Sequence, residues 1–232
     1  MDKFSYEIDG KQLLVYRSIY APVKSNMFTI LTGNEAVVFD PNVDEDLIYL
    51  FQKEKIENVY ILLTHGHYDH ISGIDWLKEH TRTKVFCQSL CAKRLQNPKR
   101  PLVRLVATVL AQQDREDGGH RYQDFKVSYK PFTIVADKTF DQEEVFKIGD
   151  LKFKVLSTPG HSEGGACYEL LDKIVFTGDT LLQNDPIILR FPGGNKDDYE
   201  KISLPYLRSL SKDTIIMPGH GDPFILKDTK NI

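Results

Sequence analysis

The sequence predicts a single α/β domain in which strands and helices alternate in both halves of the 232-residue chain. Short apolar runs bounded by turn residues recur along its length, and segments with helical periodicity separate many of them. The composition is 41% hydrophobic and 27% charged, which is ordinary for a globular protein. We see no linker and no shift in composition, so we expect one domain spanning residues 1–232.

In the first half, the residues of segment 44–55 place Leu47, Ile48, Leu50 and Phe51 on one helical stripe. The Thr-Gly-Asn-Glu sequence at 32–35 is a turn signal between two apolar runs. On this basis we expect strands at 12–16, 27–31, 36–40, 59–63 and 84–87, and helices at 44–55 and 71–80.

In the second half, Gly149-Asp150 is a two-residue link typical of a β-hairpin. We expect this hairpin to join strands 144–148 and 151–156, and a second hairpin to join strands 166–170 and 174–177. After them we expect a helix at 198–210 that is interrupted near Pro205, and a last strand at 214–217. The intervening segment, at about 98–139, has a looser pattern with one helix candidate at 102–111. We interpret it as an insert or lid, with an ordinary core helix as the alternative.

The formal net charge of −3 argues against a general nucleic-acid binder. Residues 93–100 are basic, and we expect them to form a solvated helix end and turn. The charged start lacks the apolar run of a secretory signal, and no window approaches the roughly 20 apolar residues of a membrane span. The three cysteines form no Cys-x-x-Cys pair, so we expect small buried side chains and a cytoplasmic location.

The segment 64–70, Thr-His-Gly-His-Tyr-Asp-His, holds three of the seven histidines of the chain. It directly follows the apolar strand expected at 59–63, so its side chains lie where a buried strand emerges. Imidazoles and a carboxylate at such a point need partners to offset their desolvation, and a divalent cation satisfies them all. His65 and His67 are two residues apart and can lean to one side, whereas Asp69 and His70 can point elsewhere.

Three other strand ends deliver the same kind of side chain. His161, Asp179 and His220 each follow an apolar strand and a turn that contains glycine, which lets the backbone pass close to an ion. Together with segment 64–70, these residues predict a metal site at one rim of the protein. His80 and His120 have no such setting, and we expect them at the surface.

At this point the sequence resembles the metallo-β-lactamase superfamily of hydrolases, with Asp40 ending an early strand as in the first motif of that family. The resemblance implies a four-layer αββα sandwich of two mixed β-sheets flanked by helices. It also implies two divalent metal ions, with zinc expected and iron or manganese as alternatives. By this resemblance, His65, His67 and His161 hold the first ion, Asp69, His70 and His220 hold the second, and Asp179 bridges both.

The resemblance further implies a hydrolase that uses a metal-bridging hydroxide to cleave a small ester or thioester. In this scheme Asp69 is also catalytic because it orients the hydroxide, and Asp40 supports the metal loops by hydrogen bonds. The expected partner is a small-molecule substrate, with neither a membrane nor a nucleic acid as partner, and a homodimer is left open.

Within the superfamily, the chain is most similar to the hydroxyacylglutathione hydrolase (glyoxalase II) group. The residues that match are Thr-Gly-Asp-Thr-Leu at 177–181 and Phe-Pro-Gly-Gly-Asn at 191–195. The chain departs from that group at Leu189-Arg190-Phe191, where a Gly-Arg-x-Asp step is usual, and it ends twelve residues after His220. Glutathione recognition is therefore left open. Arg190 is a candidate contact for an anionic group of the substrate, with a surface salt bridge as the alternative.

Three other functions use the same residues. A phosphodiesterase or nuclease needs the same seven ligands, and the basic residues of 93–104 would then contact phosphates. A persulfide dioxygenase needs only His65, His161 and Asp179 around one iron. A non-catalytic binding protein would use the metal for stability alone.

Overall fold

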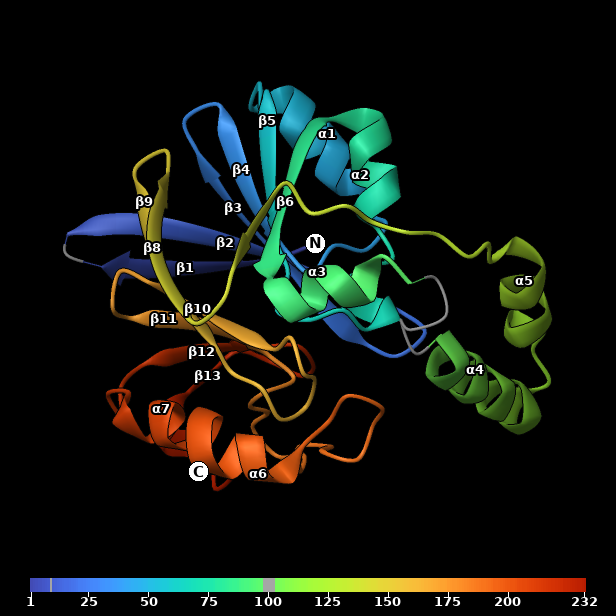
Figure 1. Ribbon diagram of the computed structural model, residues 1–232. Coiled ribbons are helices and arrows are strands. Elements are labelled where there is room, and N and C mark those ends of the chain that lie inside the picture. Colours follow the sequence, from blue (N-terminus) through green and yellow to red (C-terminus); the bar gives the residue numbers. More distant parts are fainter. Residues whose placement is uncertain (9, 98–102) are drawn as a thin grey trace.

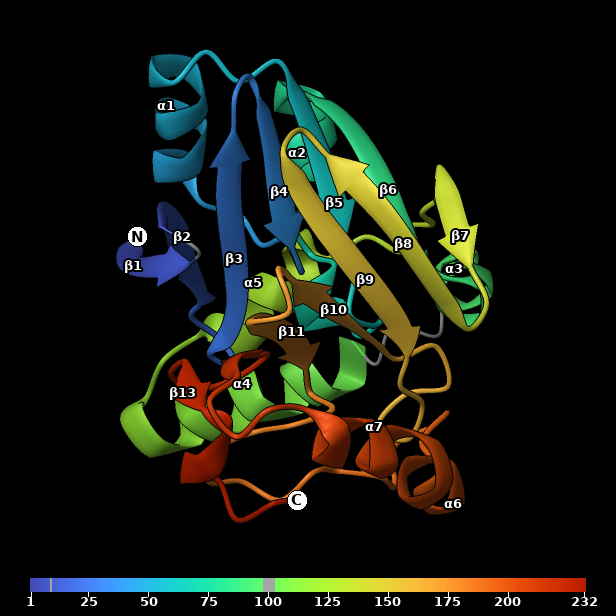
Figure 2. The same cartoon turned by 90° about the vertical axis from the view of Figure 1, so that its left-hand side faces the viewer.

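The computed structural model describes residues 1–8, 10–97 and 103–232, and all statements below concern these residues. Two mixed β-sheets pack face to face, and helices cover their outer faces (Figures 1 and 2). The fold is thus the predicted αββα sandwich. Within the described residues, no helix combines the length and the apolar character that crossing a membrane requires.

The first sheet has seven strands, and their order in the sheet follows the order of the chain. The strands up to β4 pair antiparallel, whereas β4 to β7 pair in parallel. These strands are β1 (Asp2–Ile8), β2 (Lys11–Tyr20), β3 (Ser25–Thr32), β4 (Glu35–Phe39), β5 (Asn58–Leu62), β6 (Arg82–Gln88) and β7 (Lys138–Phe140).

The second sheet has six strands in the order β13-β12-β11-β10-β9-β8. All its pairs are antiparallel except β11 with β12, which is parallel. The strands are β8 (Glu143–Ile148), β9 (Leu151–Ser157), β10 (Ala166–Leu170), β11 (Ile174–Gly178), β12 (Ile215–Pro218) and β13 (Phe224–Ile225).

The helices divide among the outer faces and one outlying pair. Residues of α1 (Glu45–Lys53), α2 (Ile74–His80) and α3 (Ser89–Leu95) share a buried cluster with the first sheet. The second sheet is covered by α6 (Lys196–Asp198), a π-helical turn (Tyr199–Ser203) and α7 (Leu204–Ser209). The pair α4 (Val103–Asp117) and α5 (Arg121–Ser128) lies to one side of the sandwich in Figure 1. Short 3-10 turns occupy Tyr68–His70 and Leu226–Asp228.

Aromatic rings join the two sheets beneath the metal-binding residues that the sequence predicts. The ring of Phe39, the last residue of β4, stacks on Phe176 of β11 with centroids 3.6 Å apart. The hydroxyl of Tyr168 donates to the carbonyl oxygen of Leu63 at 2.9 Å, which links β10 to the chain just beyond β5. Since the residues that follow these strands carry the predicted ligands, the same packing that forms the core fixes where those ligands lie.

Several elements agree with the sequence analysis. Both predicted hairpins are present, and Gly149 adopts a φ of +52° in the first of them. His80 and His120 are exposed, as expected. The three cysteines, Cys87, Cys91 and Cys167, are free and buried, which confirms the expectation of small buried side chains.

The helix expected at 198–210 is interrupted before Pro205, because a π-helical turn separates α6 from α7 and accommodates the proline, which has no N–H to donate. Other predictions were wrong or incomplete. The segment at 98–139 holds a second helix, α5, and the edge strand β7, neither of which was predicted. The strands β1 and β13 and the helix α3 were missed as well, and residue 102 of the expected helix 102–111 lies outside the described residues.

Candidate metal centre

Five strands of the two sheets end at one shared edge, and each is followed by a predicted site residue. Parallel pairing of β4 with β5, and of β11 with β12, sends the carboxyl ends of each pair to the same edge. Asp40 follows β4, the segment His65 to His70 follows β5, His161 follows β9, Asp179 follows β11 and His220 follows β12.

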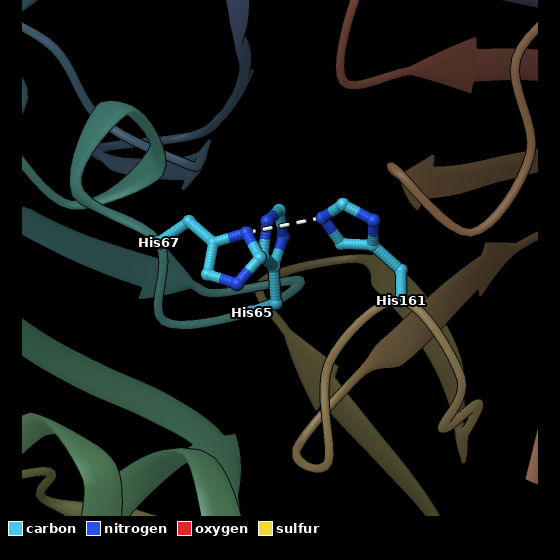
Figure 3. A group of neighbouring side chains, drawn as sticks. All are labelled: His65, His67 and His161. Atoms are coloured by element: carbon cyan, nitrogen blue, oxygen red, sulfur yellow. Dashed lines mark hydrogen bonds between the residues drawn. The ribbon is translucent and has the colours of Figure 1, made fainter. Parts of the chain in front are cut away.

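One group of side chains consists of His65, His67 and His161, which point toward one another in Figure 3. A ligand atom from each lies within 4.8 Å of the others, and all three residues are buried. Nδ1 of His67 and Nε2 of His161 are 3.0 Å apart. Three imidazole nitrogens at this spacing can hold one divalent cation.

A second group consists of Asp69, His70 and His220, whose ligand atoms also lie within 4.8 Å of one another. Oδ2 of Asp69 is 3.4 Å from Nε2 of His70 and 3.4 Å from Nε2 of His220. One carboxylate oxygen and two imidazole nitrogens form another set of donors suited to a divalent cation.

Asp179 lies between the two groups. Its Oδ2 is 3.4 Å from Nε2 of His161 in the first group and 3.5 Å from Nε2 of His220 in the second. Its Oδ1 is 3.5 Å from Nε2 of His70. The structure therefore brings together all seven residues that the sequence analysis proposed as ligands, with Asp179 in contact with both groups.

The Asp40 carboxylate orients two of the imidazoles. It accepts hydrogen bonds from the Thr64 backbone N–H at 2.8 Å and from the Thr64 hydroxyl at 2.6 Å, and Nδ1 of His70 lies 2.9 Å from it. Asp40 also lies within 4.8 Å of ligand atoms of His65 and His70, but these hydrogen bonds already occupy its oxygens. We therefore interpret Asp40 as a support of the ligands rather than as a ligand.

The same logic sets the tautomers of three ligand histidines. Since the Thr64 hydroxyl donates to Asp40, its oxygen can accept from Nδ1 of His65, which is 3.0 Å away. Nδ1 of His161 is 2.8 Å from the carbonyl oxygen of Ile188 and can only donate there. With Nδ1 carrying a proton in His65, His70 and His161, Nε2 of each is directed into the site and is the atom that would bind a cation.

The two groups differ in protonation. Burial, together with neighbouring imidazoles, holds the pKa values of His65 and His67 well below the usual imidazole range. Both imidazoles are therefore neutral and can bind a metal ion without losing a proton. Burial would also lower the pKa of His70, but the Asp69 and Asp179 carboxylates outweigh it and raise the pKa to about 9. For His220, the Asp179 and Asp69 carboxylates likewise outweigh the effect of burial and raise the pKa to about 11. A cation in the second group would take the place of these protons beside the carboxylates.

Unpaired polar atoms test whether the site fits metal ions. Among the described residues, the buried Nε2 atoms of His65, His67 and His70 and Oδ1 of Asp179 have no hydrogen-bond partner. Orphaned buried polar atoms are rare and costly in native proteins. Four of them, all of ligand type and all on the proposed ligand residues, fit divalent cations.

Glycine is required at two positions of this edge. A Cβ atom on Gly219 would lie 2.1 Å from Oδ1 of Asp179, and one on Gly178 would lie 2.2 Å from the Thr64 hydroxyl oxygen. Gly178 also has a φ of +50°. Only residues without a side chain let the two loops approach the ligands this closely.

Arg190, the predicted substrate contact, is exposed and is followed by a residue that touches the site. The Phe191 ring lies 6.0 Å from His67 and 5.8 Å from His161, measured between ring centroids. In the sequence, Phe191 stood out only as part of the motif at 191–195, and its contact with the ligands was not predicted. The available indication was the turn signalled by the glycine pair at 193–194, where the Gly194 N–H donates to the Phe191 carbonyl oxygen at 2.7 Å.

Arg94 corrects the interpretation of residues 93–100 as solvated, since it is only 3% exposed. Its guanidinium donates to the Pro192 carbonyl oxygen at 2.7 Å and to Glu163 at 3.4 Å, which fixes the loop that carries Phe191. Local sequence gave no sign of this, because the partners lie far along the chain. Residues 98–100 of the stretch lie outside the described residues.

Tyr68 joins segment 64–70 to the aromatic residues of α5 and the chain after it. It is the one half-buried residue of segment 64–70, and its ring lies 5.6 Å from both Phe125 and Tyr129 and 6.2 Å from Phe132. These rings come from α5 and the chain just after it, so Tyr68 connects the metal-binding segment to the α4–α5 pair. Phe125 and Tyr129 are four residues apart, a helical spacing that was the available signal.

Comparisons with known proteins agree with this geometry. The chain is 28% identical over 202 residues to the probable metallo-hydrolase YqgX of Bacillus subtilis, with 86% of each chain covered. It is 29% identical over 189 residues to the hydroxyacylglutathione hydrolase GloC of Haemophilus influenzae, with 80% of each covered. The crystal structure of the BLEG-1 B3 metallo-β-lactamase superposes with a TM-score of 0.68 at 27% identity, covering 92% of this chain and 95% of that one. The metallo-β-lactamase superfamily profile matches residues 20–220, and the chain therefore belongs to this superfamily.

Proposed function

We propose that the protein is a hydrolase with two metal ions that cleaves a small ester or thioester. The observation that carries this proposal is the division of seven donors into two groups that share Asp179. Similarity to a probable metallo-hydrolase and to a hydroxyacylglutathione hydrolase supports the reaction class. Zinc is the proposed metal, with iron and manganese as alternatives, because imidazole and carboxylate donors suit all three.

The ligands have separate tasks in this proposal. His65, His67 and His161 hold the first ion, Asp69, His70 and His220 hold the second, and Asp179 joins them. Ions bound there would lower the pKa of a water molecule toward neutrality and polarise the scissile carbonyl group.

Asp69 is proposed as the residue that orients the attacking water. Its side chain is only 11% exposed, and Oδ2 faces His70 and His220. Burial would raise the pKa of Asp69, but the charge of His70 and the hydrogen bond from His220 outweigh it and lower the pKa. Asp69 is therefore an ionised hydrogen-bond acceptor that can orient a water molecule through its O–H group.

The organic part of the substrate is proposed to contact Phe191 on one side of the site and the α4–α5 pair on the other. Phe191 touches two ligands of the first group, and Tyr68 adjoins Asp69 of the second. Arg190, exposed beside Phe191, is the proposed contact for an anionic group. Aromatic walls and one cation suit a small organic acid derivative better than a polymer.

A mononuclear iron enzyme is the second candidate, because His65, His161 and Asp179 alone provide two imidazoles and one carboxylate. The complete second group argues for two ions instead. The phosphodiesterase alternative is weakened by Arg94, since this buried side chain is bonded to Pro192 and Glu163 rather than available to a phosphate.

The proposal is tested by metal analysis of the native protein and by a panel of thioesters, lactones and phosphodiesters. We expect about two divalent ions per chain and turnover of a thioester or ester that chelation abolishes and added metal restores. Turnover of bis(p-nitrophenyl) phosphate alone would favour the phosphodiesterase. One iron per chain with oxygen uptake on a persulfide would favour the dioxygenase.

A further inference from the structure

The loop 218–222, called here the His220 loop, is held by residues of the first sheet although it belongs to the second. The Asn26 backbone N–H donates to the Gly219 carbonyl oxygen at 2.7 Å, and its side-chain amide donates to the carbonyl oxygens of Pro218 at 2.9 Å and Gly221 at 2.7 Å. The position of His220 therefore depends on strand β3 of the first sheet.

Arg17 on β2 makes the charged part of this connection. Its Nη1 donates to the Gly221 carbonyl oxygen at 3.2 Å and to Oδ1 of Asp222 at 2.7 Å, while its Nε donates to Oδ2 of Asp2 at 3.1 Å. The guanidinium also lies 5.2 Å from the centroid of the Phe4 ring. One side chain thus joins strand β1 to the residues immediately after His220.

This contact differs from an ordinary surface salt bridge. The Arg17 side chain is only 9% exposed, whereas Asp2 and Asp222 are 54% and 81% exposed. Exposed ion pairs contribute little to stability, but a buried guanidinium that holds a backbone carbonyl oxygen fixes where that backbone lies. The carbonyl in question belongs to the residue next to His220.

The first group of ligands has other supports. His161 is held by the Ile188 carbonyl oxygen, and His65 is held by Thr64. The second group is held at two points by residues of β2 and β3, because the Ser25 hydroxyl also donates to the Asp69 carbonyl oxygen at 3.0 Å. A change at Arg17 should therefore act on the second group and leave the first unaffected.

We propose that Arg17 is a positioning residue for the second metal ion, acting through Gly221 and Asp222 on His220. The inference rests on the proposed two-ion function.

The test is a titration of chelator-treated protein with Co²⁺, followed by its visible absorption and by metal analysis. We expect wild type to bind two equivalents. In Arg17→Met, which keeps the apolar stem over Phe4, the first equivalent should bind as in wild type and the second on the order of 10- to 100-fold more weakly. Arg17→Lys should lie between the two, because an ammonium cannot replace the guanidinium fork.

Arg82→Met is the matched control, since Arg82 is an exposed arginine on strand β6, and it should titrate as wild type. If circular dichroism shows that Arg17→Met does not fold, Asp222→Asn provides the test, because the exposed Asp222 side chain can change without disturbing the core. We expect Asp222→Asn to weaken binding of the second equivalent alone. Unchanged binding of the second equivalent, or equal weakening of both, would overturn the inference. Wild type that binds fewer than two ions would instead contradict the proposed function, and the inference with it.

Discussion

The metal-binding edge and the α4–α5 pair are held in contrasting ways. At the edge, His65, His67 and His70 are buried, and Thr64 and Asp40 fix the orientation of His65 and His70. Helix α5 has no buried residue at all. The hydrogen bond from Gln113 of α4 to the Pro22 carbonyl oxygen, at 3.0 Å, and the aromatic contacts with Tyr68 connect the pair to the rest of the molecule.

This difference separates the reaction from the choice of substrate. Buried side chains that hydrogen bonds orient keep catalytic groups in one geometry, whereas segments with few buried contacts open at low free-energy cost. Changes at the edge should therefore alter metal binding and the catalytic rate. Changes in the α4–α5 pair should alter substrate affinity and leave the metal ions in place.

The largest effect is expected for His67→Ala. It removes a nitrogen donor from the first group, so we expect loss of metal and a fall in activity of more than about 100-fold. Even mutation of a residue that only hydrogen-bonds to a metal ligand typically lowers metal affinity or activity about 10- to 100-fold. Metal content and turnover of the preferred ester or thioester measure this. His80→Ala, at an exposed histidine of α2, is the control and should match wild type. Full metal content and full rate in His67→Ala would refute the ligand assignment.

Asp69→Asn should act mainly on the rate. The amide keeps an oxygen that can bind metal but loses the charge that orients the attacking water, so kcat should fall by about 10²-fold at saturating metal. Asp75→Asn changes an exposed aspartate of α2 and serves as the control. An unchanged kcat in Asp69→Asn would remove Asp69 from the catalytic step.

Asp40→Asn should weaken metal binding on the order of 10- to 100-fold, because the amide no longer offers two anionic oxygens to Thr64 and His70. Asp40 has a φ of +51°, a backbone conformation that asparagine also tolerates, so the change isolates the lost charge. Asp172→Asn is a close control, since Asp172 is exposed and has a φ of +53°. Competition with a metal chelator measures the affinity, and equal affinities in the two variants would contradict the role of Asp40.

The contrast between the two regions also explains what the sequence could predict. The seven ligands were accessible because each follows an apolar strand in a short, recognisable motif. Arg94 and Arg17 were not, because each acts through contacts with residues far along the chain. Helix α5 was missed because it is short and buries no residue, although Phe125 and Tyr129 have the spacing of one helical face.

The smallest effect is expected for Phe125→Ala in α5. Removing this ring takes away one of the aromatic contacts with Tyr68, next to Asp69, and an aromatic pair contributes about 0.5–1.5 kcal/mol beyond its burial. We therefore expect KM for the preferred substrate to rise about three- to tenfold, with kcat and metal content unchanged. Val127→Ala, at a side chain 84% exposed on the same helix, should leave KM as in wild type. Loss of metal in Phe125→Ala would show that α5 supports the metal-binding edge itself. An unchanged KM across the panel would show that the substrate contacts lie elsewhere, and Phe191 and Arg190 would be the next residues to change.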